Sequence, residues 1–111
     1  MIKRFVFIIS DGTGITAESL AHSLMTQFEN IEFEKETVPY LDSMEKAAVL
    51  IARINKCYEE TGIKPLIFMT LVNPEINAYI NQSKACIFDL FSTFLAPLEQ
   101  ELDAKSSYTV G

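Results

Sequence analysis

Residues 10–14, Ser-Asp-Gly-Thr-Gly, form the segment of this sequence that is best suited to bind an anion. The segment follows an apolar run and precedes a helical pattern that opens near Ile15. Its two glycines permit a tight turn that exposes backbone amides, and the positive end of the following helix attracts negative charge. We therefore predict a site for an oxyanion, namely a phosphate, made of Ser10, Asp11, Gly12, Thr13, Gly14 and Thr16.

The same loop also allows two other interpretations. Residues 12–17 match the GxGxxA variant of the dinucleotide fingerprint, and Glu34 or Glu36 follows at the usual spacing of about 20 residues. Against this match, Asp11 would repel a pyrophosphate unless Mg²⁺ or a proton intervened. The plainer alternative is that the two glycines only make a strand-to-helix turn.

Asp11 is the one candidate catalytic residue in this loop. Its carboxylate suits proton transfer or metal binding, but it also suits capping of the next helix, which is the role we favour. Ser10 and Thr13 have hydroxyls that can hold a phosphate oxygen or Mg²⁺, although hydroxyls at turns more often form local hydrogen bonds. We assign no residue as a metal ligand.

A second loop, residues 71–75, contributes Asn73 and Glu75 as further binding candidates. With Pro74, these residues also have the pattern of the N-cap and first turn of a short helix that reaches about residue 82. His22 lies one helical turn after Glu18, and an isolated pair of this kind is usually a surface contact rather than a catalytic pair. No GxxxxGK[ST] phosphate loop occurs in the 111 residues.

The elements that must position these loops alternate between strands and helices. Residues 3–9 and 65–72 are nearly unbroken apolar runs, which are typical of strands covered by helices on both faces. Residues 31–38 alternate instead and predict an edge strand. The fold class we predict is α/β: a Rossmann-like three-layer domain with a short parallel sheet, in the order 2-1-3, and helices on both faces. Its ligand crevice would lie between strands one and three.

Helical spacing predicts four helices. The second helix begins with a capping box of Asp42 and Glu45 and ends at Gly62, and the fourth spans residues 88–102 with a break or bend at Pro97. Apolar stripes are expected on the first helix at Leu20, Ala21, Leu24, Met25 and Phe28, and on the second at Met44, Ala47, Ala48, Ile51, Ile54 and Tyr58. The fourth helix is apolar nearly all round, so we expect it to need cover on more than one side.

Composition limits the class of protein. The chain has 111 residues, of which 49% are hydrophobic, and its formal net charge is −6, so we expect one folded domain (residues 1–103) with a linker-like tail (residues 104–111) and no nucleic-acid partner. Cys57 and Cys86 are predicted to be reduced core residues. No apolar stretch reaches the roughly 20 residues of a membrane span, so we expect a cytoplasmic protein without a membrane partner.

Several segments, taken together, resemble one family of regulatory enzymes. Residues 7–18 with 24–28 resemble the start of the bacterial phosphoenolpyruvate synthase regulatory proteins and the related plant pyruvate, phosphate dikinase regulatory proteins. Residues 61–68 running into 73–76, and residues 95–101, extend the resemblance over nearly the whole chain. This ordered set of motifs is far more specific than the glycine pattern alone.

The resemblance implies a bifunctional serine/threonine kinase and phosphorylase that uses ADP and inorganic phosphate, with Mg²⁺ as a possible further requirement. Its target would be phosphoenolpyruvate synthase or pyruvate, phosphate dikinase, switched off by threonine phosphorylation. Family members are more than twice as long and carry a nucleotide-binding loop in their second half, so we expect this chain to be an N-terminal portion that is inactive alone. Further expected partners are that second half and a second copy of the chain.

Two other functions remain as alternatives. The chain could be a stand-alone phosphate- or dinucleotide-binding module, or an interaction domain that docks the target enzyme.

Overall fold

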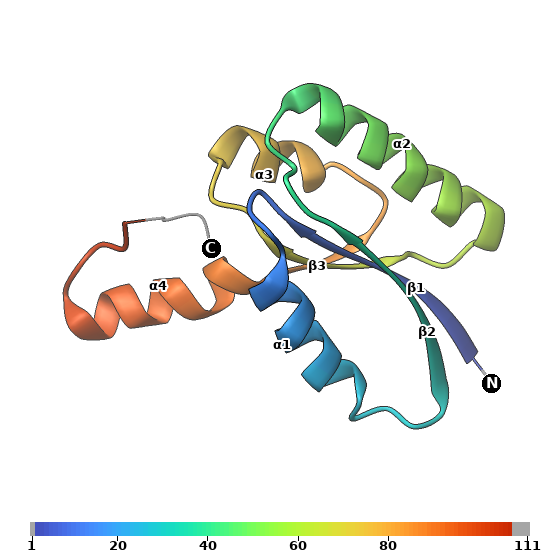
Figure 1. The fold of residues 1–111 in the computed structure, drawn as a ribbon, viewed down its shortest axis with the longest axis horizontal. Coiled ribbons are helices and arrows are strands. Elements are labelled where there is room, and N and C mark those ends of the chain that lie inside the picture. The colour runs from blue at the N-terminus through green and yellow to red at the C-terminus, as the bar shows by residue number, and fades with distance from the viewer. Residues whose placement is uncertain (1, 108–111) are drawn as a thin grey trace.

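A parallel sheet of four strands, in the order β2-β1-β3-β4, organises residues 2–107, the part of the chain that the computed structural model describes (Figure 1). Its strands are β1 (Ile2–Ser10), β2 (Ile31–Val38), β3 (Leu66–Thr70) and β4 (Cys86–Asp89). Helices α2 (Met44–Thr61) and α3 (Pro74–Ile80) cover one face, and α1 (Ile15–Met25) covers the other. The predicted Rossmann-like α/β architecture is confirmed.

Two apolar clusters hold the layers together, one on each face of the sheet. Alternate residues of β1 point to opposite sides, so Phe7 and Ile9 pack with α2 and α3 while Val6 and Ile8 pack with α1. Full burial of one such side chain stabilises the fold by about 1.5–3 kcal/mol, so the two central strands dominate the packing. This burial on both faces explains the unbroken apolar runs in their sequences.

The end of α2 and the start of α3 are capped as predicted from the sequence, but the start of α2 is not. Gly62 ends α2 in the left-handed conformation (φ 72°), and the Asn73 side chain accepts hydrogen bonds from the Glu75 and Ile76 amides, as predicted. The predicted Asp42–Glu45 capping box is wrong. Ser43 is the N-cap of α2 and accepts from the Lys46 amide, whereas Asp42 forms an ion pair with the Lys46 side chain.

The segment after α3 differs most from the prediction. Residues 86–89 form the fourth strand, which pairs with β3, and helix α4 (Leu90–Leu102) begins two residues later than expected. Three apolar residues followed by Asp89 carry too little periodicity to distinguish a strand from a helix. The helix also continues through Pro97, so of the predicted break or bend the break is wrong.

Burial corrects several core assignments. Helix α1 ends at Met25, so Phe28 lies beyond it and is exposed, as are Leu24 and Met44. The prediction of two core cysteines is wrong: both are free thiols, but Cys86 is exposed and Cys57 is only half-buried. None of the helices in residues 2–107 has the length and apolar character needed to cross a membrane.

The division into a domain and a tail stays a prediction, because residues 108–111 lie outside the described part. Within residues 103–107, the Ala104 amide donates to the Glu99 carbonyl at 3.1 Å, and the Ser106 amide donates to Glu99 Oε2 at 2.7 Å. These bonds direct the chain back along α4.

Candidate functional site

The two predicted loops meet at the carboxyl ends of β1 and β3, through the side chain of Asp11. Its Oδ2 accepts hydrogen bonds from the backbone amides of Val72 (2.8 Å) and Asn73 (3.3 Å). The favoured role of Asp11 as a cap of α1 is therefore wrong, because the carboxylate reaches across to the loop that follows β3. Bonds to a charged acceptor are strong, so Asp11 fixes one loop relative to the other.

Ser10 points into the protein and shapes the loop from below. It is fully buried, and its hydroxyl accepts a hydrogen bond from the Gly12 amide at 3.0 Å. Two further backbone bonds, Leu41 to the Ser10 carbonyl (2.9 Å) and Tyr40 to the Gly12 carbonyl (2.8 Å), attach the loop to the segment that follows β2. In this structure the Ser10 hydroxyl is occupied by a local hydrogen bond.

The start of α1 is the part of the predicted site that faces outward. Its N-cap, Gly14, has φ 83° and provides no side-chain cap, and Thr13 Oγ1 makes only a long bond of 3.4 Å with the Ile15 amide. Thr13 and Thr16 are both exposed. A helix start of this kind leaves amide donors for an anion, which is the chemistry predicted for the loop.

Thr70 lies beside the predicted site and was not singled out in the sequence analysis. It is the last residue of β3, pairs in register with Ser10, and is 3% exposed. In the described part of the chain, neither Thr70 Oγ1 nor Asp11 Oδ1 has a hydrogen-bond partner, although both atoms are buried. The only sequence signal was a hydroxyl residue near the end of an apolar run, which is too common to single out.

The second loop contributes structure rather than free ligands. The Asn73 side chain is used to cap α3, and Glu75 lies exposed in the first turn of that helix. The acids of the dinucleotide match are also engaged: Glu34 pairs with Lys3, and Glu36 pairs with Arg53 of α2. Both lie within β2, before its carboxyl end, so the geometry gives the dinucleotide interpretation no support.

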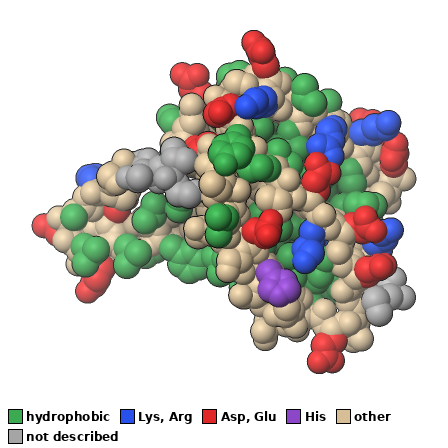
Figure 2. Space-filling view, viewed as in Figure 1, with side chains coloured by type: hydrophobic (Ala, Val, Ile, Leu, Met, Phe, Trp, Pro, Cys, Tyr) green, Lys and Arg blue, Asp and Glu red, His purple; other side chains and the backbone are tan. Residues whose placement is uncertain are grey.

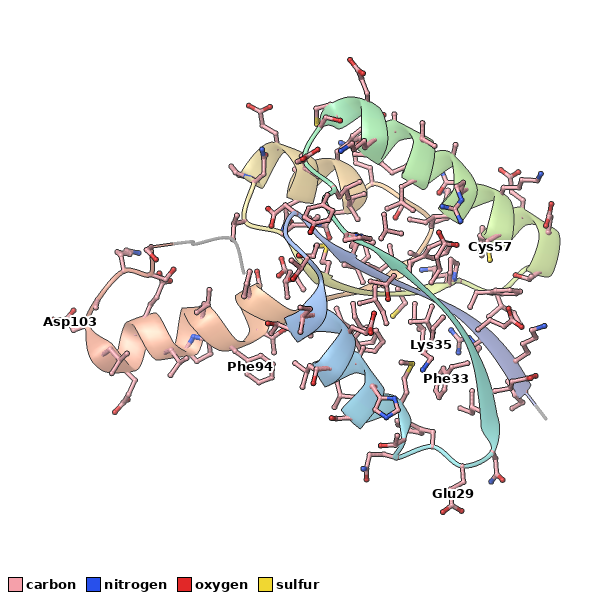
Figure 3. All side chains as sticks on the ribbon, viewed as in Figure 1. Glu29, Phe33, Lys35, Cys57, Phe94 and Asp103 are labelled. Carbon is pink, nitrogen blue, oxygen red and sulfur yellow. The ribbon has the colours of Figure 1, made fainter. Side chains whose placement is uncertain are left out.

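A groove of about 530 Å³ runs beside the loop, between α1 and β2. Thr13, Glu18, His22 and Lys35 line it, and the Thr37 hydroxyl donates to Glu18 Oε2 at 2.6 Å. Figure 2 shows the single histidine near a basic and an acidic side chain on this face, and Figure 3 shows Lys35 on the neighbouring strand. Within residues 2–107, no three metal-ligating side chains cluster.

The fold and this site define a class of protein: a Rossmann-like α/β domain with a glycine-containing loop, at the point where the strand order reverses, that leads into an uncapped helix. Residues 6–111 match the model of the kinase/pyrophosphorylase family. The chain belongs to this family.

Curated relatives agree with this assignment. The chain is 63% identical over 110 residues to a protein of Legionella pneumophila, 61% to one of Hahella chejuensis and 57% to one of Pseudomonas fluorescens. Each of these proteins is named as a phosphoenolpyruvate synthase regulatory protein. The match covers 99% of this chain but only 40–41% of the relatives' lengths.

We expect Asp11→Ala to lower the free energy of unfolding by about 2–3 kcal/mol, because the Val72 and Asn73 amides lose a charged acceptor. Asp11→Asn keeps an acceptor oxygen and should lose less. Urea denaturation measures both, with Asp42→Ala as a control for removal of an exposed carboxylate. Equal stability of Asp11→Ala and the unmodified chain would contradict the bridging role.

Gly14→Ala and Gly62→Ala separate backbone strain from crowding. Both glycines have positive φ, so each alanine costs about 1–2 kcal/mol. A Cβ at Gly14 would also lie 3.3 Å from Thr37 Cγ2, whereas one at Gly62 meets nothing within 4 Å. Thermal denaturation should therefore show the larger loss for Gly14→Ala, and the reverse order would show that the loop relaxes freely.

Proposed function

We propose that this chain is the N-terminal part of a bifunctional enzyme that controls phosphoenolpyruvate synthase. The enzyme transfers the β-phosphoryl group of ADP to a threonine hydroxyl of the synthase, leaving AMP. In the opposite direction, inorganic phosphate attacks the phosphothreonine, releasing pyrophosphate and the free hydroxyl. Membership of the kinase/pyrophosphorylase family supports this reaction type, and the names of the relatives favour the synthase over the dikinase as target.

Within that enzyme, we assign the loop of residues 10–14 and the start of α1 to binding of a phosphate group. The observation that carries this assignment is the uncapped helix start beside a loop that Asp11 and Ser10 hold rigid. Phosphoryl transfer depends mainly on positioning and on stabilising charge, and fixed amides at a helix start supply both. Thr13 and Thr16 add hydroxyl donors at the same place.

Asp11 is the residue we propose for handling the threonine proton. Its Oδ2 is fixed by two amides, so its Oδ1, which has no partner within the described residues, is held in a defined direction. This oxygen is buried, so the target hydroxyl reaches it only if the loop opens around the substrate. A general base must be positioned before its basicity matters.

We assign nucleotide binding to the part of the enzyme outside this chain, because these 111 residues contain no GxxxxGK[ST] loop.

Thr16→Glu tests the phosphate site in a full-length enzyme that carries this region. An acid in the first turn of a helix favours the fold but repels a bound phosphate, so we expect a Tm that is not lowered and a KM for inorganic phosphate raised at least about tenfold. Thr16→Gln is the neutral control. The same KM in both variants would place the phosphate elsewhere.

The 111-residue chain alone should neither phosphorylate nor dephosphorylate the synthase, because it lacks the nucleotide-binding part. Mass spectrometry of the target threonine, with ADP or inorganic phosphate present, measures both directions. Turnover by the chain alone would overturn the assignment of nucleotide binding to another part of the enzyme, and would show that the site is complete within these residues.

A further inference from the structure

Strand β4 runs into helix α4 without a loop, and this leaves one face of the domain open. Asp89 is both the last residue of the strand and the N-cap of the helix, accepting a hydrogen bond from the Ser92 amide. Because no loop separates the strand from the helix, the chain has no residues with which to turn back over the strand. Figure 1 shows the result: α4 extends away from the sheet, whereas α1, α2 and α3 lie against it.

An apolar stripe follows this continuous segment on the side of the sheet where α1 packs. Every second residue from Cys86 to Leu90, namely Cys86, Phe88 and Leu90, lies on that side. Within α4, every fourth residue after Leu90 lies on the same side of the helix. Leu90 is the only buried residue of α4. We define the β4–α4 stripe as its exposed apolar members, which are Phe88, Phe94, Leu98 and Leu102, with exposures of 43%, 54%, 51% and 69%.

The sheet next to the stripe is also incompletely covered. Phe88 stacks on Phe68 with ring centroids 5.3 Å apart, and the two rings line an apolar pocket of about 180 Å³. Leu24, in the last turn of α1, and Phe28, just beyond that helix, are both exposed and line the same pocket. Figure 2 shows hydrophobic side chains gathered along one side of α4, and Figure 3 shows Phe94 extending from that helix. An apolar surface of this kind marks an interaction site.

We propose that the β4–α4 stripe and the adjoining pocket are the docking surface for the part of the family's polypeptide that lies outside the matched region. The relatives share only 40–41% of their length with this chain, so the larger part of each protein is available to cover the surface. Residues 103–107 turn back along α4, which keeps the chain that leaves the helix close to it.

Charge favours this occupant over a second copy. Helix α4 and its C-cap carry Glu99, Glu101 and Asp103, and α4 contains no Lys or Arg. Two copies would each bring these acids to the interface, and each copy as a whole has a formal net charge of −6. We therefore expect the covering segment to present an apolar surface edged by basic side chains.

Cys86 provides a natural reporter of cover on this face. It lies two residues before Phe88 on the same side of β4, and its side chain is exposed. Cys57 lies in α2, on the opposite face, and burial raises the pKa of its thiol, with a smaller contribution from Glu60. Alkylation of Cys57 should be slow whether or not the open face is covered, so this thiol serves as the internal reference.

The experiment compares iodoacetamide alkylation of Cys86 in the 111-residue chain and in a full-length protein that carries it, followed by peptide mass spectrometry. We expect alkylation in the full-length protein to be at least about tenfold slower, with no dependence on protein concentration. Equal rates in the two proteins would overturn the proposal. So would slow alkylation in the 111-residue chain that becomes fast on dilution, because a second copy would then be the occupant.

Phe94→Glu in the full-length protein tests the helix part of the surface. It should speed alkylation of Cys86 without changing that of Cys57. The matched control is Val49→Glu, which changes an exposed apolar residue on α2 (64% exposed, compared with 54% for Phe94) and should leave both rates unchanged. Unchanged Cys86 labelling in the Phe94→Glu variant would overturn the proposal for α4. No step measures enzyme activity, so this result is independent of the proposed function.

Discussion

The bond between the Asp11 carboxylate and the amides of Val72 and Asn73 is the interaction on which the site depends. It joins the loops that follow β1 and β3, the two strands between which the sheet order reverses. An open α/β sheet normally offers this crevice to a ligand. Here a carboxylate of the protein itself accepts the hydrogen bonds from the amides of the second loop. The amides that remain without a side-chain cap are those at the start of α1.

Elements made of long, periodic segments could be predicted from the sequence. The apolar runs of β1 and β3, the alternation in β2, and the Asn73 cap each express a local rule, so the fold class and both loops were placed correctly. The partners of Asp11 could not be predicted, because the residues that it binds lie 61 and 62 positions away. A carboxylate just before a helix looks like a cap until the neighbouring loop is known.

The region after α3 shows a second limit. Cys86–Asp89 is a strand because it pairs with the free edge of β3. The sequence of these four residues does not show that such an edge is available. By contrast, the apolar excess of α4 was evident from composition, and the structure confirms that Phe94 and Leu98 stay exposed. The sequence thus predicted that the helix has more apolar residues than one side of the domain covers, but the direction in which it leaves the sheet depends on tertiary pairing.

The edge of the sheet that carries the loops and the open face beside α4 each lack something that the rest of an enzyme would have to supply. At the loop edge, no Lys or Arg occurs in residues 10–16 or 71–76, so amides and hydroxyls are the only donors that these segments offer to a phosphate. Transfer of a phosphoryl group requires stronger neutralisation than neutral donors provide. On the open face, the β4–α4 stripe lacks the apolar cover that the rest of the core has. A segment that packs on this stripe and carries cationic side chains to the loop edge would meet both demands.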